Sequence, residues 1–116
     1  MGKSELLRAL TEQLAGLAGD PATRVVGHPP TDPAKWYPTT IIDPRSGKPF
    51  TDAGAWDFVA EMLVGDNRVN IQSFDTPPNE TAYTMNIPTT AGIIYIKVRM
   101  GKGRIIGRSF HYSDHQ

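Results

Sequence analysis

The sequence lacks cysteine, long apolar runs and net charge, and each absence excludes a class of protein. Without cysteine the 116-residue chain has no disulfide scaffold, no thiolate nucleophile and no thiolate metal site. Its apolar stretches are too short to cross a bilayer, and its first residues lack the apolar core of a signal peptide. We therefore expect a cytoplasmic protein without membrane contact. The length predicts a single domain, 1–116, divided here into 1–19, 20–50 and 51–116.

Charge is balanced over the whole chain but not along it. Twelve Lys and Arg match twelve Asp and Glu, which excludes a polycation that coats nucleic acid. The segment from Gly92 to Tyr112 nevertheless holds five cations and no acid. The other residues carry seven cations and all twelve acids. The sequence therefore predicts a local positive surface near its C-terminal end.

Two amphipathic helices are predicted. The first runs from Ser4 to Ala18, with leucines at helical spacing, and ends at Gly19. Its apolar stripe either packs on the core of the domain or docks on a partner. The second runs from Asp52 to Val64, is capped by Thr51 or Asp52, and stops at Gly65. Its expected buried face consists of Trp56, Val59, Ala60 and Leu63.

The connection between these helices, residues 20–50, contains seven of the ten prolines. Proline density of this kind indicates extended, turn-rich chain rather than helix. One short strand is expected at Thr39 to Asp43. Three aromatic residues are expected to pin the connection to the surface of the domain: Trp36, Tyr37 and Phe50.

The remainder of the chain predicts an antiparallel sheet. Strands are expected at Arg68 to Phe74 and Thr81 to Ile87. Two further strands, GIIYIKVR and RIIGRSFH, flank the glycine-containing turn MGKG and predict a β-hairpin. The predicted fold class is α+β, with two helices packed on one face of a three- to five-stranded twisted antiparallel sheet.

Burial predicts the register of this hairpin. If Arg99 faces Arg104, nearly all aliphatic side chains share one side, and a slip of one residue would bury Arg108. The apolar face then holds Ile94, Ile96, Val98, Met100, Ile105, Gly107 and Ser109. The opposite face holds Tyr95, Lys97, Arg99, Arg104, Ile106 and Arg108. Like charges facing each other across a ladder are destabilising, so this face is expected to bind an anion, and phosphate is the usual one.

His111 ends the last expected strand and suits proton transfer near neutral pH. Cleavage of RNA needs a base for the 2′-hydroxyl, a cation for the charge on phosphorus and an acid for the leaving oxygen. His111, Arg108 and Lys97 supply these types within one hairpin. Strict alternation places His111 on the face opposite Arg108, and a β-bulge or a frayed strand end would bring them together.

The C-terminal half, from about Trp56 to His111, resembles the MqsR-type toxins, which are ribonucleases of bacterial toxin–antitoxin systems with a RelE-like or barnase-like fold. The matching motifs are the WDFVAEML helix, a tyrosine at Tyr83, IIYIKV and the terminal IIGRSFH. The resemblance implies RNA cleavage without metal, a 2′,3′-cyclic phosphate product and a cognate antitoxin. It also implies a catalytic role for Tyr83, although alternation places this residue in the core. The lysine that this family carries in an earlier strand falls near Gln72, and the proline-rich connection is foreign to the family.

The leading hypothesis from the sequence is a metal-independent, toxin-like endoribonuclease that needs no cofactor. Its catalytic residues would be His111, Arg108, Lys97 and Tyr83, and its RNA-binding residues Arg99, Arg104, Lys102 and Tyr95. No metal-ligand spacing occurs in the chain. Two alternatives remain open: a module that binds RNA or an anionic protein without catalysis, and an immunity or antitoxin-type protein whose N-terminal helix forms the interface.

Overall fold

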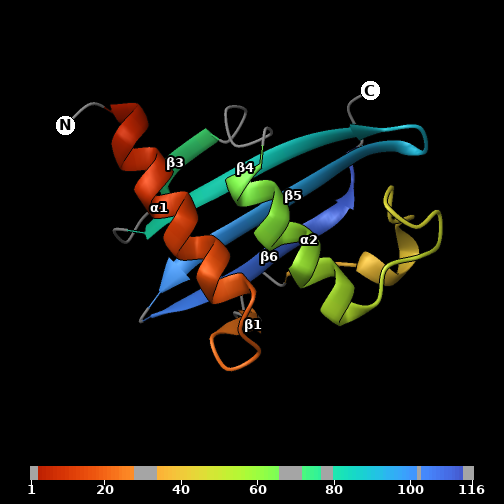
Figure 1. The fold of residues 1–116 in the computed structure, drawn as a ribbon, viewed down its shortest axis with the longest axis horizontal. Coiled ribbons are helices and arrows are strands. Elements are labelled where there is room, and N and C mark those ends of the chain that lie inside the picture. The colour runs from red at the N-terminus through yellow and green to blue at the C-terminus, as the bar shows by residue number, and fades with distance from the viewer. Residues whose placement is uncertain (1–2, 28–33, 66–71, 77–79, 102, 114–116) are drawn as a thin grey trace.

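A computed structural model describes residues 3–27, 34–65, 72–76, 80–101 and 103–113. The helical elements are α1 (Lys3–Ala18), the short 3-10 helix η1 (Pro38–Thr40) and α2 (Asp52–Val64). The strands are β1 (Arg24–Val26), β2 (Lys35–Trp36), β3 (Gln72–Thr76), β4 (Glu80–Thr89), β5 (Gly92–Gly101) and β6 (Arg104–Tyr112). Figure 1 shows α1 and α2 lying across the same face of a twisted sheet. The predicted α+β class, with both helices on one face, is confirmed.

The sheet is mixed, whereas the sequence predicts a purely antiparallel one. Its order across the described strands is β1-β6-β5-β4-β3, and β2 also pairs with β6. The four strands from β3 to β6 are antiparallel neighbours, as predicted. The short strands β1 and β2 lie one after the other along β6 and run parallel to it. They come from the proline-rich connection, which has no strand-like alternation by which it could have been recognised.

Both helices lie close to their predicted bounds. Thr51 caps α2, because its Oγ1 accepts a hydrogen bond from the Gly54 N–H at 2.9 Å. Beyond the end of α1, the Arg24 guanidinium donates to the Ala18 carbonyl at 3.0 Å, and Thr23 Oγ1 donates to that of Leu17 at 2.8 Å. These bonds satisfy carbonyls that the helix itself leaves without donors.

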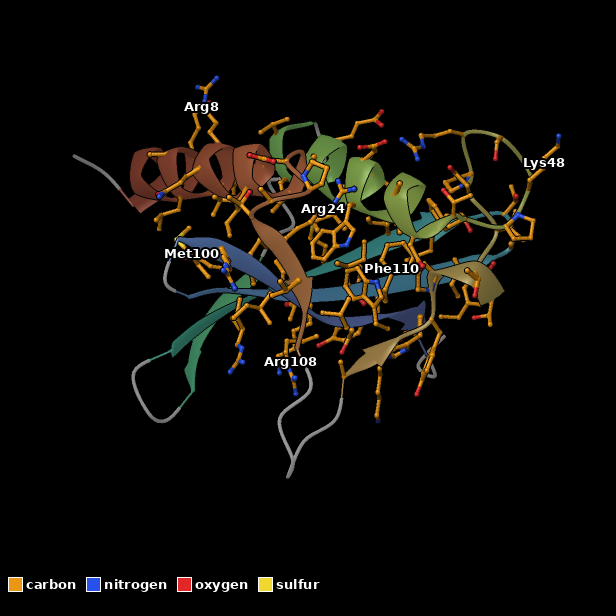
Figure 2. All side chains as sticks on the ribbon, turned by 90° about the horizontal axis from the view of Figure 1, so that it is seen from below. Arg8, Arg24, Lys48, Met100, Arg108 and Phe110 are labelled. Atoms are coloured by element: carbon orange, nitrogen blue, oxygen red, sulfur yellow. The ribbon has the colours of Figure 1, made fainter. Side chains whose placement is uncertain are left out.

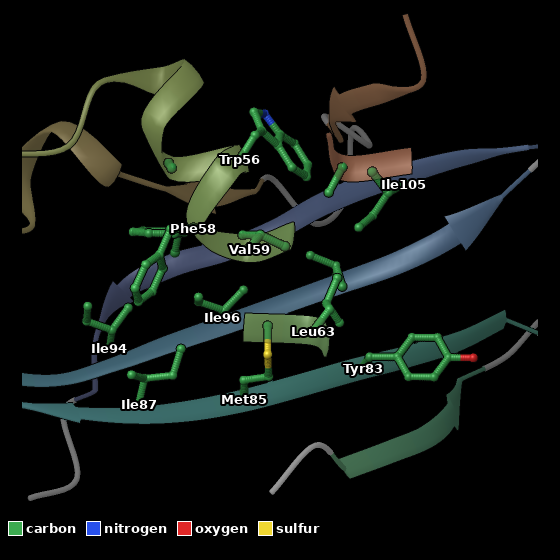
Figure 3. Close-up of a cluster of buried hydrophobic side chains, with 14 of the residues drawn as sticks. Trp56, Phe58, Val59, Leu63, Tyr83, Met85, Ile87, Ile94, Ile96 and Ile105 are labelled. Carbon is green, nitrogen blue, oxygen red and sulfur yellow. The ribbon is translucent and has the colours of Figure 1, made fainter. Parts of the chain in front are cut away.

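One hydrophobic core lies between the helices and the sheet (Figure 3). From α1 it takes Leu14 and Ala18, both fully buried, and Leu17 packs against it, so the C-terminal end of the apolar stripe packs on the protein's own core. From α2 it takes Phe58 in addition to three residues of the predicted face, while Ala60 is only half-buried. The sheet contributes Tyr83, Met85, Ile87, Ile94, Ile96, Val98, Ile105 and Phe110.

The proline-rich connection is held to this core by two of its three aromatic residues. The ring of Trp36 lies 4.8 Å from that of Trp56, and Phe50 is 3% exposed. Tyr37 differs from the prediction, because 53% of it is exposed. The strand expected at 39–43 is also wrong. The chain forms η1 there, and only Ile42 makes an isolated β-bridge, to Pro49.

No helix in the described ranges is long and apolar enough to cross a membrane.

Candidate nucleic-acid interface

The face of the sheet turned away from α1 and α2, here called the outer face, carries the cations of the hairpin. Along β5, Lys97 and Arg99 alternate with Ile96 and Val98, both fully buried in the core. Tyr95 lies on the outer face by the same alternation. At the start of β6 the fully buried Ile105 places its exposed neighbour Arg104 on the outer side. The two-faced hairpin that the sequence predicts is therefore present.

The register of the hairpin differs from the predicted one. Arg99 faces Ile106, and Arg104 faces Gly101. The two arginines are diagonal neighbours on the outer face, so the directly opposed pair from which anion binding was expected is absent. Ser109, predicted on the apolar face, instead faces Lys97 on the outer face. Pairing continues as far as Gly101 and Arg104, which moves the partners of β5 by two residues, and an irregularity between Lys97 and Val98 moves them by one more.

A β-bulge at Arg108 interrupts the pairing of β5 with β6. Val98 pairs with Gly107 and Lys97 pairs with Ser109, which leaves Arg108 as the extra residue. The bulge reverses the alternation of β6 from that point on. Phe110 therefore turns into the core, where it is fully buried, and His111 turns to the outer face. Bulges occur often beside active sites, where they redirect one side chain.

The His111 ring is held by two contacts. Its Nδ1 lies 2.9 Å from the Tyr112 carbonyl oxygen, and its centroid lies 5.4 Å from that of Tyr95, the residue opposite it. A carbonyl oxygen only accepts hydrogen bonds, so Nδ1 is the protonated nitrogen. In the neutral ring Nε2 then carries the lone pair and can accept a proton.

Lys97 and Tyr95 complete the surroundings of His111. Lys97 pairs directly with Ser109, so His111 is its diagonal neighbour on the same face, about 7–8 Å away between backbones. Burial raises the pKa of the Tyr95 phenol above its ordinary value of 10.0. Tyr95 therefore keeps its proton at neutral pH and can donate a hydrogen bond.

Arg108 lies on the outer side of the sheet but is not exposed to solvent. Figure 2 shows its side chain pointing away from the helices, on the opposite side of the sheet from Phe110. It is only 6% exposed, and its Nη1 donates to the Gly27 carbonyl oxygen at 3.2 Å. The prediction of a solvent-facing Arg108 is therefore wrong. Its guanidinium ties the end of β1 to the bulge instead.

One other predicted site residue, Tyr83, does not join this group. Tyr83 is 4% exposed and packs in the core, on the helix side of the sheet (Figure 3). The sheet therefore separates Tyr83 from His111, and the role implied by the resemblance has no support in its position. Lys102 lies outside the described residues.

One cation of the outer face was missed in the sequence. Lys35 pairs with Ser109 from the other side of β6, so Lys35, Ser109 and Lys97 form a row across three strands. Lys35 is exposed. Its position depends on a parallel pairing with a strand more than seventy residues away, and no local pattern in the sequence indicates that pairing.

A cavity lies outside this group. It has a volume of about 460 Å³ and opens at the β1 edge of the sheet, and the residues that line it include Trp36, Trp56, Arg24 and Asp52. Among the residues that the structure describes, no three His, Cys, Asp or Glu side chains come together as metal ligands.

Comparison of the chain with protein-family models, with curated proteins and with solved structures gives no match in any of the three. The resemblance to the MqsR-type toxins therefore stays a prediction. Function is inferred from the residues of the outer face.

Proposed function

We propose that this protein is an endoribonuclease that cleaves RNA on its outer face without a metal ion. The observation that carries the proposal is the bulge at Arg108, which puts His111 on the same face as Lys97. The ring of His111 is oriented through Nδ1 by the Tyr112 carbonyl. RNA brings both the phosphate charge that a cationic face attracts and a 2′-hydroxyl that a histidine can deprotonate.

The chemistry follows from these positions. His111 Nε2 accepts the proton of a 2′-hydroxyl, and the 2′-oxygen attacks the adjacent phosphorus. The bond from phosphorus to the 5′-oxygen breaks, which gives a 2′,3′-cyclic phosphate and a free 5′-hydroxyl. The Lys97 ammonium neutralises the charge that builds up on phosphorus and supplies the proton that the leaving oxygen takes. Tyr95 donates a hydrogen bond to the same phosphate, and Arg99 and Arg104 bind flanking phosphates.

Regulation and location enter the proposal through the resemblance alone. A toxin-like ribonuclease acts on cytoplasmic RNA and is neutralised by a cognate antitoxin. The cytoplasmic location and the antitoxin are therefore parts of the proposal that rest on the resemblance to the MqsR-type toxins.

A binding module without catalysis is the second candidate. Arg108 and Tyr83, two of the four residues expected to be catalytic, are buried away from solvent. The outer face keeps its cations in either case. A protein that binds RNA through Lys97, Arg99 and Arg104 and leaves it intact would fit this second candidate.

The test is incubation of the purified protein with single-stranded RNA in EDTA, beside His111→Ala and a control variant, Lys48→Met. Lys48 is exposed, and in Figure 2 it lies at the upper right of the molecule, level with the helices, whereas Arg108 points out below the sheet. We expect the parent protein and Lys48→Met to cleave RNA to cyclic phosphate ends. His111→Ala should be slower by roughly 10²–10⁴-fold, the usual effect of losing a general acid or base.

Three results decide the matter. A contaminating ribonuclease would act equally in all three preparations, so a difference between variants assigns the activity to this chain. Full cleavage by folded His111→Ala would remove the histidine from the mechanism. RNA that is bound but not cleaved by the parent protein would favour the binding module. The dependence of the cleavage rate on pH should also differ between the parent protein and the His111 variant.

A further inference from the structure

Tyr37 follows the last residue of β2, and its backbone is bonded to the residue before His111 in β6. In the parallel pairing of β2 with β6, Trp36 lies opposite Phe110, and the Tyr37 N–H donates to the Phe110 carbonyl at 2.9 Å. Trp36 packs inward on Trp56. The φ of Tyr37, −126°, is that of a strand, so its side chain points to the face opposite Trp36, which is the outer face, and its ψ of 49° then turns the chain into η1.

Packing does not account for this aromatic side chain. Tyr37 is 53% exposed, the most exposed large hydrophobic residue in the described ranges, while its neighbour Pro38 is buried. Trp36 packs against the described core cluster, and Tyr37 is not among the residues that do so. A large ring left in water next to a cationic face has a surface that a flat ligand could cover.

Tyr37 extends a row of rings across the outer face. His111, Tyr95 and Asn86 lie at successive lateral positions on β6, β5 and β4, and Tyr37 comes directly after the last pair of β2 with β6. Neighbouring strands lie about 4.8 Å apart. The next row along the strands contains Lys35, Ser109, Lys97 and Thr84. Aromatic rings beside a row of cations are the arrangement by which proteins bind the bases and phosphates of a single strand.

We propose that the outer face binds single-stranded RNA across the strands, with one unpaired base stacked on Tyr37 and the adjoining phosphates between Lys35 and Lys97. This inference rests on the proposed function and names its substrate class. A base inside a duplex already stacks on its neighbours and is not available to a tyrosine ring. Stacking on Tyr37 therefore requires an unpaired base, which selects single strands over duplexes.

The experiment measures affinity for a fluorescent 12-nucleotide 2′-O-methyl RNA and for the matching 12-base-pair duplex. The methyl group blocks attack by the 2′-oxygen, so binding is measured without cleavage. The variants are Tyr37→Ala, Tyr37→Phe and, as the electrostatic control, Arg104→Ala. Arg104 is exposed on the same face and provides charge without a ring.

We expect Tyr37→Ala to bind the single strand roughly 5- to 150-fold more weakly, the range measured for loss of one stacked base. Tyr37→Phe should keep parental affinity, and duplex binding should not change in either variant. The dependence of affinity on salt should stay the same in Tyr37→Ala. In Arg104→Ala its slope should fall by about one, because one phosphate contact is lost.

Parental affinity of Tyr37→Ala for the single strand would overturn the inference, as would an equal loss for the duplex or an absence of RNA binding by the parent protein. Failure of the proposed catalysis gives a different result. If the parent protein does not cleave RNA but binds single strands through Tyr37, the inference holds and the ribonuclease proposal fails.

Discussion

At the scale of single residues, Gly107 shows how closely the connection packs on the sheet. A Cβ at this position would lie 2.7 Å from Cζ3 of Trp36 and 2.9 Å from two other atoms of the same ring. The ring has no simple way to move, because Trp56 lies 4.8 Å from it and Phe110 lies 5.3 Å from it. Only glycine lets β2 lie this close to β6.

We therefore expect Gly107→Ala to lower the free energy of unfolding by about 1–3 kcal/mol, the usual cost of overpacking a core. Gly16→Ala is the matched control, since nothing lies within 4 Å of a Cβ there and the site is within α1. That change should raise stability by roughly 0.5–1 kcal/mol through helix propensity. Thermal unfolding compares the two. Equal melting temperatures of Gly107→Ala and the parent protein would mean that Trp36 is not fixed in place.

At the scale of elements, β6 combines a structural and a functional task through its bulge. Gly107 faces the core side before Arg108, and Phe110 faces it after Arg108. Without the extra residue, Phe110 and His111 would exchange faces. Arg108 fills the bulge and donates to the Gly27 carbonyl, and Gly27 N–H donates to the Gly107 carbonyl at 3.0 Å. These two bonds tie the end of β1 to the bulge.

Arg108→Met should consequently act on stability first. It leaves the Gly27 carbonyl without this donor, and we expect a loss of about 1–3 kcal/mol in urea unfolding. Arg104→Met, on the exposed start of the same strand, should change stability by no more than about 0.5 kcal/mol. If Arg108→Met instead kept full stability and lost cleavage, Arg108 would act on the phosphate, as expected from the residue types that RNA cleavage needs.

At the scale of the whole molecule, a charged cluster joins the connection to α2. Asp43 is 8% exposed, and Arg45 Nη2 lies 2.9 Å from its Oδ2. Arg45 Nη1 lies 2.9 Å from Glu61 Oε2 in α2, and the guanidinium lies 5.1 Å from the centre of the Phe58 ring. Burial by itself raises the pKa of the Asp43 carboxyl. The hydrogen bonds and charge of Arg45 together outweigh burial, so that pKa lies below its ordinary value of 3.8.

The direction of this shift determines an effect of pH on stability. The folded state favours the ionised carboxylate, so its contribution is present above the unfolded pKa and is lost as the pH falls through the folded one. We expect Asp43→Asn to be less stable than the parent protein at pH 7 by about 1–2 kcal/mol, a value reduced because Arg45 is partly exposed. The difference should shrink below about pH 4.

Asp57→Asn, at an exposed position of α2, is the control and should follow the parent curve. Urea unfolding between pH 2 and pH 7 measures all three proteins. A constant difference between Asp43→Asn and the parent protein over this range would show that the charge of Asp43 does not stabilise the fold.

The sequence by itself determined the elements whose pattern is local. Leucines at helical spacing and the Thr51 cap predicted both helices, and alternation in β5 correctly separated Lys97 and Arg99 from Ile96 and Val98. These features follow from one physical cause: a helix or strand with one buried face repeats its apolar residues with its own period. The candidate site was predicted only as a cationic face, because strict alternation placed His111 on the opposite side of the sheet.

Only the tertiary structure decided which residues of that face meet. The bulge at Arg108 depends on the burial of Phe110 against Phe50 and Phe58, whose rings lie 5.1 and 6.4 Å away and which come from outside the hairpin. The places of Lys35 and Tyr37 depend on the parallel pairing of β2 with β6. Such contacts join residues that are far apart in the chain. They produce no periodic pattern in any short segment, so they cannot be predicted from local sequence.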